Sequence, residues 1–313
     1  MADFAFVFPG QGSQSVGMLD GWGDHPAVRD TLDEASAALG SDLGRLIQDG
    51  PEDELALTTN TQLVMLVAGV ANYRAWRAEG GPAPTAVAGH SLGEYSALVA
   101  AGALTLAEAV PLVRFRAQAM QEAVPPGVGA MVAVLGLDGI DVQRGCEQAA
   151  RDSGEVVAAA NYNDPKQTVI AGSKAGVAMA VELLKSMGAK RAMPLAVSAP
   201  FHCALMKPAA ERLKQRLAAT ELCTPQIPVI NNIDVAIETD PDRIRDALYR
   251  QAFGPVRWVE LIGELHARGL RYMFECGPGR VLAKIIKRIE HEGVETAVVL
   301  DPATLAEAKA MLV

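Results

Sequence analysis

Short hydrophobic runs alternate along the first part of the chain with longer segments in which apolar residues recur at helical spacing. Two of these runs, Phe4–Phe8 and Ala86–Ala88, predict short buried strands. The segment Thr61–Trp76 predicts a helix with an apolar body, and further helices are expected over Ser91–Ala101 and Thr105–Ala123. Such alternation of strands and helices predicts a mainly parallel sheet covered by helices.

The rhythm changes between about residues 127 and 197, where we expect the order βαββαβ, the ferredoxin-like arrangement. Pro125-Pro126-Gly127 and Ser198-Ala199-Pro200 are typical breaks at its two ends. We therefore predict a small ferredoxin-like domain, 127–197, inserted into a large α/β-hydrolase-like domain made of 1–126 and 198–313, with a cleft between them. The small domain's expected elements are strands Gly129–Leu135, Glu155–Asn161, Gln167–Ala171 and Arg191–Val197, and helices Asp138–Arg151 and Ser173–Met187.

The large domain resumes after the insertion with the same alternation of strands and helices. A short final helix is expected to close the chain. The other expected elements are helices Ala204–Ala219, Asp242–Gln251, Val256–Gly269 and one from Gly279 to about Glu292, and strands Ile227–Asn231, Tyr272–Cys276 and Ala297–Leu300.

Composition narrows the class of protein. Half of the 313 residues are hydrophobic and 21% are charged, which favours a well-packed core over disorder. The net charge of −9 argues against general affinity for nucleic acid or anionic membranes. The four cysteines have no metal-type spacing, the start of the sequence lacks the features of a signal peptide, and no stretch approaches the length of a membrane span. We expect a soluble cytoplasmic protein with reduced thiols.

A serine lies between two glycines in Gly89-His90-Ser91-Leu92-Gly93, where a predicted strand turns into a predicted helix. This pattern is the nucleophile-elbow signature, in which glycines permit a tight turn that exposes the serine hydroxyl. The helix N-terminus after Ser91 also favours developing negative charge. The alternative is a chance match in an ordinary strand–helix turn.

A serine nucleophile needs a base, and the chain has five histidines. His202 lies in the loop that returns from the small domain and faces the predicted cleft, although a structural role is equally open from composition. His90 is expected to point away from its neighbour Ser91. The other three, His25, His266 and His291, occur in polar surface contexts.

An oxyanion site needs backbone N–H groups aimed at one point. One is expected from Leu92, which follows the serine. The other is expected from the Gly-rich loop Phe8–Gln14 at the end of the first strand, where α/β sheets place ligands. The loop alone could equally hold a phosphate, but it lacks the spacing of a P-loop or dinucleotide fingerprint.

Five stretches together resemble the malonyl-CoA:acyl carrier protein transacylases of bacterial type II fatty-acid synthesis. They occur in the family's order and span nearly the whole chain: FPGQGSQ (8–14), GHSLGEYSALVAAGAL (89–104), RAQAMQEAVPPGVGAM (116–131), PFHCALMKPAA (200–210) and ECGPGRVL (275–282). The resemblance implies ping-pong transfer of malonyl from malonyl-CoA to the phosphopantetheine thiol of holo acyl carrier protein, with no metal or redox cofactor.

The resemblance also implies roles for individual residues. Ser91 is the acyl-accepting nucleophile, His202 its general base, and the amides of Gln11 and Leu92 the oxyanion hole. Gln251 matches a family glutamine that lines the site, near a backbone carbonyl that orients the histidine in place of an aspartate.

Two further residues bear on the choice of substrate. The resemblance implies that Arg116 binds the malonyl carboxylate, and a guanidinium can grip a carboxylate with two parallel hydrogen bonds. Arg114 lies two positions earlier on the same predicted helix and points elsewhere. Phe201 precedes His202. In related modular synthases a bulky residue at this position accompanies a malonyl substrate and a smaller one methylmalonyl, although core packing is an alternative role for Phe201.

An acyl carrier protein is acidic, so docking on this acidic chain needs local positive charge. We expect docking at a basic stripe; the alternative is an ordinary solvated helix face. We also expect a monomer, although no feature of the sequence fixes the oligomeric state. The stripe consists of Arg280, Lys284, Lys287 and Arg288, to which Lys190 and Arg191 are added.

Other functions remain open from the sequence. A malonyl transferase of a polyketide or malonate decarboxylase system would use a different carrier. A serine esterase would share the elbow but would need an acidic residue and then a histidine after the serine. A binding-only module would not need Ser91, His202 and Arg116 together.

Overall fold

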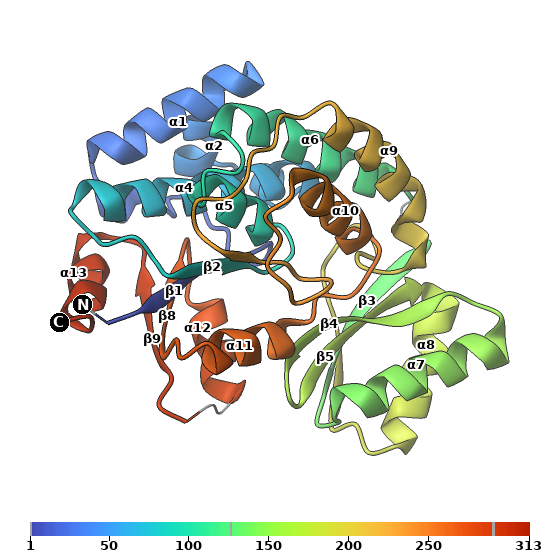
Figure 1. The fold of residues 1–313 in the computed structure, drawn as a ribbon. Helices are drawn as coiled ribbons and strands as arrows, with labels where there is room; N and C mark the ends of the chain where they lie inside the picture. Colours follow the sequence, from blue (N-terminus) through green and yellow to red (C-terminus); the bar gives the residue numbers. More distant parts are fainter. Residues whose placement is uncertain (1, 126, 290–291) are drawn as a thin grey trace.

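The computed structural model describes residues 2–125, 127–289 and 292–313, which form two lobes of unequal size (Figure 1). The predictions for Pro126 and His291 lie outside these residues. Within the described parts of the chain, every helix is too short or too polar to cross a bilayer.

The large lobe is built on a five-stranded parallel sheet with the order β7-β2-β1-β8-β9. In the central strand, the side chains of Phe4, Phe6 and Phe8 face one layer of helices and those of Ala5 and Val7 face the other. Burial on both faces explains why the strand is continuously apolar. The strands are β1 (Phe4–Phe8), β2 (Ala86–Gly89), β7 (Val229–Ile230), β8 (Tyr272–Cys276) and β9 (Glu295–Val299).

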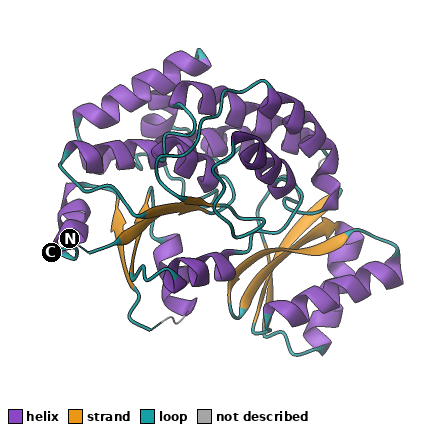
Figure 2. Cartoon of the chain, in the orientation of Figure 1, coloured by secondary structure: helices purple, strands orange, loops and turns teal. Residues whose placement is uncertain are grey.

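Helices cover both faces of this sheet (Figure 2). The buried helix α4 (Thr58–Ala78) packs on the aromatic face, where Trp76 meets Phe6 edge to face at 5.2 Å between ring centroids. Side chains from α1 (Pro26–Leu39), α2 (Leu43–Asp49), α3 (Glu52–Leu55), α5 (Gly93–Ala100), α6 (Leu106–Glu122), α9 (Lys207–Ala218), α10 (Pro241–Gln251) and α13 (Pro302–Ala310) join the same core. The opposite face is covered by α11 (Trp258–Ala267) and α12 (Val281–Ile289).

The small lobe is an antiparallel sheet with the order β4-β5-β3-β6 and its own core beneath two helices. This is the predicted βαββαβ arrangement, and the predicted fold class is confirmed. The division at residues 126/127 and 197/198 stays a prediction. The elements are β3 (Gly129–Leu135), α7 (Gly139–Ser153), β4 (Val157–Asp164), β5 (Gln167–Ser173), α8 (Lys174–Ser186) and β6 (Arg191–Pro194).

Several predicted boundaries were wrong. The strand expected to reach Val197 ends at Pro194. Beyond it the amide of Leu195 makes one more bond to the carbonyl of Met131, at 3.0 Å, and the amide of Val197 turns back to the carbonyl of Leu195, at 2.9 Å. The helix expected from Ala204 is divided into a 3-10 turn, Ala204–Met206, and α9, with Pro208 in the first turn of α9. Strand β4 begins later and ends later than expected, and two register shifts interrupt its pairing with β5.

The two lobes are joined where β4 meets the segment before α11. The amide of Tyr162 donates to the carbonyl of Val256, and the amide of Val256 donates to Ala160, each at 2.9 Å. These bonds place one edge of the small sheet beside the carboxyl ends of β1 and β2, which is where parallel α/β sheets bind ligands.

Candidate active site

Ser91 occupies a sharp turn between β2 and α5, with a backbone φ of 51°. A Cβ at Gly89 would lie 1.9 Å from the backbone carbon of Gly93, and a Cβ at Gly93 would lie 2.1 Å from the carbonyl oxygen of Phe8. Neither position accepts a side chain. The two glycines therefore permit the turn that presents the Ser91 hydroxyl at the sheet edge.

The hydroxyl of Ser91 lies next to the imidazole of His202. The distance from Oγ to Nε2 is 2.7 Å. On the other side of the ring, Nδ1 donates to the carbonyl oxygens of Gln251 at 2.9 Å and Gly254 at 3.2 Å. Because carbonyls only accept, Nδ1 carries the proton and Nε2 is free to accept one from serine. Backbone carbonyls thus occupy the place of a triad aspartate.

Burial keeps His202 neutral. Its side chain is in the interior, and desolvation together with the nearby positive charge of Arg116 lowers the pKa of His202 to about 3. The imidazole is therefore unprotonated at neutral pH, as a general base must be.

Arg116 projects from α6 into the site and is only 2% exposed. Its Nη1 donates to Oε1 of Gln62 at 2.6 Å, and its Nη2 lies 3.2 Å from both Ser91 Oγ and Gln251 Oε1. No carboxylate among the described residues forms an ion pair with it, and Nε has no hydrogen-bond partner there. The charge of Glu94 acts on Arg116 from farther away. A buried cation that forms no ion pair and faces a nucleophile is suited to an anionic substrate.

Arg114 lies elsewhere on the same helix, as its spacing predicted. Its Nη1 donates to the carbonyl of Thr59 and the side chain of Asn60, each at 3.1 Å. Only one of the two arginines reaches Ser91.

Gln251 is fully buried at the end of α10, behind the reacting groups. Its Nε2 donates to the carbonyl of Ser91 at 3.0 Å and to a carboxylate oxygen of Glu94 at 3.0 Å. The backbone carbonyl of Gln251 accepts a hydrogen bond from Nδ1 of His202. The glutamine therefore contacts both members of the Ser91–His202 pair.

The backbone amides of Gln11 and Leu92 donate to none of the residues that the structure describes. Both residues line the same cavity as Ser91. Two unengaged amides beside a nucleophile are available to an oxyanion.

This cavity has a volume of about 340 Å³ and lies between the two lobes. The large lobe contributes the reacting groups and Phe201, whose side chain is buried in the wall, and the small lobe contributes Met131, Asn161 and 195–197. The described residues contain no cluster of three or more His, Cys, Asp or Glu side chains that could hold a metal ion.

Sequence reasoning missed three buried polar residues of this site. They are Glu94, in the first turn of α5, Asn232, after β7, and Gln62, in α4. Glu94 had a visible signal, since it is a lone charge in a helix whose other residues are mostly apolar. His90 lines the same cavity as Ser91, and its Nε2 lies 2.8 Å from Oδ1 of Asn163; the base hydrogen-bonded to Ser91 is His202.

The basic stripe lies on the surface of α12 and the preceding turn, with its four side chains exposed. Arg288 is not free, because its Nε donates to Asp164 at 2.6 Å. Strand pairing aligns Asp164, Gln167, Leu135 and Arg191 in one row across the small sheet, so that Lys190 and Arg191 lie at the same end of that sheet as Arg288.

The chain is similar to known proteins along nearly its whole length. Residues 5–305 match the family described as the acyl transferase domain. The malonyl CoA-acyl carrier protein transacylase of Escherichia coli (strain K12) is 53% identical over 290 residues, which cover 92% of this chain and 93% of that protein.

Solved structures agree with this similarity. An acyl-carrier-protein S-malonyltransferase from Burkholderia pseudomallei superimposes with a TM-score of 0.96 at 58% identity, covering 99% of this chain and 100% of that one. A malonyl-transacylase solved in complex with its type II PKS acyl-carrier protein gives a TM-score of 0.96 at 49% identity, covering 99% and 100%.

Proposed function

The chain belongs to the acyl transferase domain family, and we propose that it transfers malonyl through an ester on Ser91 with His202 as the base. It is an acyltransferase of the malonyl-CoA:acyl carrier protein transacylase class, whose partners are malonyl-CoA and acyl carrier protein and whose products supply fatty-acid synthesis. The resemblance read from the five sequence motifs is confirmed.

In the first half-reaction, Ser91 Oγ attacks the thioester carbon of malonyl-CoA while Nε2 of His202 accepts the hydroxyl proton. The amides of Gln11 and Leu92 donate to the oxyanion of the tetrahedral intermediate. The intermediate collapses with cleavage of the carbon–sulfur bond, and His202 returns its proton to the CoA thiolate. A malonyl-Ser91 ester and free CoA result.

In the second half-reaction, the phosphopantetheine thiol of the carrier protein replaces CoA. His202 accepts the thiol proton, and the thiolate attacks the ester carbon. The carbon–oxygen bond to Ser91 breaks, and the proton returns to Oγ. His202 serves both half-reactions because its Nε2 accepts a proton from each nucleophile and returns a proton to each leaving group.

The observation that carries this proposal is the buried guanidinium of Arg116 at 3.2 Å from the nucleophile, without a carboxylate partner among the described residues. The free carboxylate of a malonyl group supplies that partner in a bidentate geometry. An acetyl group leaves the cation unpaired. Phe201, in the cavity wall, crowds an α-methyl group and so favours malonyl over methylmalonyl.

We also propose how the carrier protein binds. Docking involves the basic stripe, chiefly Arg280, Lys284 and Lys287, because the fourth member, Arg288, is engaged with Asp164; Lys190 and Arg191 lie at the same end of the small lobe. A monomer is sufficient, since the site is complete within one chain. A cytoplasmic location is part of the same proposal and rests on four free cysteines.

Two alternatives differ in the acceptor. One structural relative is a malonyl-transacylase bound to its type II PKS acyl-carrier protein, which favours a polyketide carrier as the second candidate. An esterase is disfavoured because His202 is oriented by carbonyls and the cavity holds a buried cation.

Intact-mass measurement after brief incubation with malonyl-CoA tests the proposal. We expect a gain of one malonyl unit that is absent in Ser91→Ala and that disappears when holo carrier protein is added. Rapid release of free malonate without an adduct would instead identify a hydrolase. Comparing carriers from fatty-acid and polyketide systems separates the two transferase functions.

A further inference from the structure

Glu94 is a buried carboxylate in the first turn of α5, and the catalytic steps above do not use it. Its side chain is 2% exposed. A single oxygen, Oε2, accepts hydrogen bonds from the backbone amide of Asn232 at 2.9 Å and from Nε2 of Gln251 at 3.0 Å. A buried carboxylate is costly unless donors surround it.

Both donors hold the backbone of the nucleophile. Oδ1 of Asn232 accepts from the amide of Ser91 at 2.7 Å, and Nδ2 of Asn232 donates to the carbonyl of Gly89 at 2.6 Å. Nε2 of Gln251 donates to the carbonyl of Ser91 at 3.0 Å. The peptide groups before and after Ser91 are therefore both held by hydrogen bonds. They need this support because the positive φ of Ser91 is unfavourable for a residue with a side chain.

Glu94 also decides which way the amide of Gln251 faces. Oε2 of Glu94 accepts from Gln251, so the NH₂ end of the amide faces Glu94 and the oxygen end faces away; this holds whether or not the other carboxyl oxygen carries a proton. The amide oxygen of Gln251 accepts from Nη2 of Arg116 at 3.2 Å. The orientation of Arg116 therefore depends on Glu94 through one intervening side chain.

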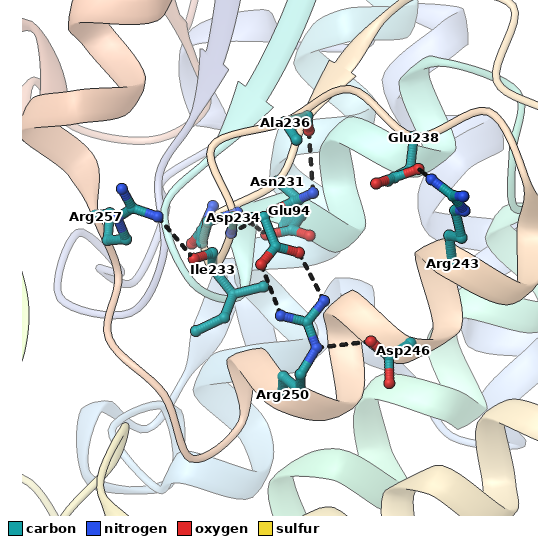
Figure 3. Close-up of polar contacts among 11 residues, drawn as sticks. Glu94, Asn231, Ile233, Asp234, Ala236, Glu238, Arg243, Asp246, Arg250 and Arg257 are labelled. Carbon is teal, nitrogen blue, oxygen red and sulfur yellow. Dashed lines mark hydrogen bonds and ion pairs between the residues drawn. The ribbon is translucent and has the colours of Figure 1, made fainter.

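A second set of contacts stabilises the loop that contains Asn232; Figure 3 shows its neighbours Asn231, Ile233 and Asp234 with their partners. In the loop from Asn231 to Ala236, Asp234 receives two hydrogen bonds from Arg250, at 2.7 and 2.6 Å. Arg257 donates to the carbonyl of Ile233 at 3.2 Å, and Nδ2 of Asn231 donates to the carbonyl of Ala236 at 3.0 Å. These contacts fix the conformation of the loop, in which the backbone amide of Asn232 donates to Glu94.

We propose that Glu94 is a positioning residue for acyl transfer: its Oε2 holds Asn232 and Gln251 so that Ser91 and Arg116 face the same substrate. The inference rests on the proposed function, because the readout is malonyl loading of Ser91. It assigns Glu94 the role of an acceptor, and a neutral oxygen in the same place can fill that role.

Three variants test this. Glu94→Met keeps the volume and removes the acceptor, so the single-turnover rate of malonyl loading at saturating malonyl-CoA should fall about tenfold or more. Glu94→Gln keeps an oxygen and should load within about threefold of the wild-type rate. Glu238→Met is the matched control and should load at the wild-type rate. Glu238 and Glu94 line one small cavity, separate from the active-site cavity, but Glu238 pairs with Arg243 and bonds neither Asn232 nor Gln251.

The outcomes separate the two proposals. If the wild-type chain forms no malonyl adduct, the proposed function fails first. If the wild type loads and Glu94→Met loads as fast, or if Glu94→Gln is as slow as Glu94→Met, the role of Glu94 is overturned while the function stands. Thermal denaturation verifies folding, and Glu94→Ala is the second loss variant if methionine prevents it. A role limited to stability would lower the melting temperature in both loss variants and leave the loading rate unchanged.

Discussion

The guanidinium of Arg116 reaches the hydroxyl of Ser91, with Nη2 at 3.2 Å from Oγ. In malonyl-CoA a single methylene separates the carboxylate from the thioester carbon. A carboxylate held by Arg116 therefore brings its own thioester to the nucleophile beside it. An acyl group with a longer chain between the two groups would overshoot, and one without a carboxylate would leave the buried cation unpaired.

Replacing Arg116 should remove the preference for malonyl. We expect Arg116→Met to lose about 2–5 kcal/mol of discrimination between malonyl-CoA and acetyl-CoA, the range for breaking a buried charge pair. The kcat/KM ratio for the two substrates measures it. Arg114→Met is the control, because Arg114 lies on the same helix but bonds Thr59 and Asn60. Unchanged discrimination in Arg116→Met would remove Arg116 from substrate binding.

Loading should stay active well below the pH at which an ordinary histidine protonates. The base form of His202 is neutral, and burial followed by the charge of Arg116 lowers its pKa to about 3. The acid limb of kcat/KM for loading, which reports the free enzyme, should therefore not appear near pH 6.5. Arg116→Met removes one of the causes that lower the pKa of His202, so the limb should move towards neutral pH. If the wild-type activity falls at acid pH with a pKa near 6.5, and this step is absent in His202→Ala, the pKa of His202 is not lowered as expected.

Reversing charge on the basic stripe should affect only the second substrate. Lys284→Glu with Lys287→Glu should raise the KM for carrier protein and leave the KM for malonyl-CoA unchanged, because attraction between exposed charges acts on the encounter. The double variant should also respond less to added salt. Lys185→Glu, on the exposed surface of α8, is the control. Equal effects on both KM values would place docking elsewhere.

The order of the elements was accessible from the sequence because local pattern decides it. The apolar run Phe4–Phe8 indicates a buried strand, and the helical spacing of apolar residues up to Trp76 indicates a helix. Boundaries were less accessible. Strand β6 ends where the amide of Val197 turns back to the carbonyl of Leu195, and β4 pairs with β5 through two register shifts; both depend on contacts that only the folded chain determines.

In the active site, too, local features could be predicted from the sequence and long-range contacts could not. The turn at Ser91 is a local feature, so its glycines could be recognised in five residues of sequence. The contacts of Asn232 and Gln251 with Ser91 join residues 141 and 160 positions apart. Such long-range contacts leave no spacing signal. Gln251 was found through family resemblance, and Asn232 was not found at all.

The buried carboxylate of Glu94 should make stability depend on pH in a predictable direction. Burial raises the pKa of Glu94 from 4.5 to about 7, against the lowering effects of its hydrogen bonds and of Arg116, and Asp234 adds to the rise. Between these two pH values the folded chain holds a proton that the unfolded chain has lost. Stability from this group is therefore present at low pH and is lost as pH rises towards 7.

Glu94→Gln removes that dependence while keeping an acceptor. Its free energy of unfolding relative to wild type should rise by about 3 kcal/mol between pH 4.5 and pH 8, which is the shift in pKa converted to energy. Urea denaturation at several pH values measures the difference. If the difference between the two proteins does not change with pH, or falls as pH rises, Glu94 does not retain its proton in the folded state, and the carboxylate is held in its charged form by Asn232 and Gln251.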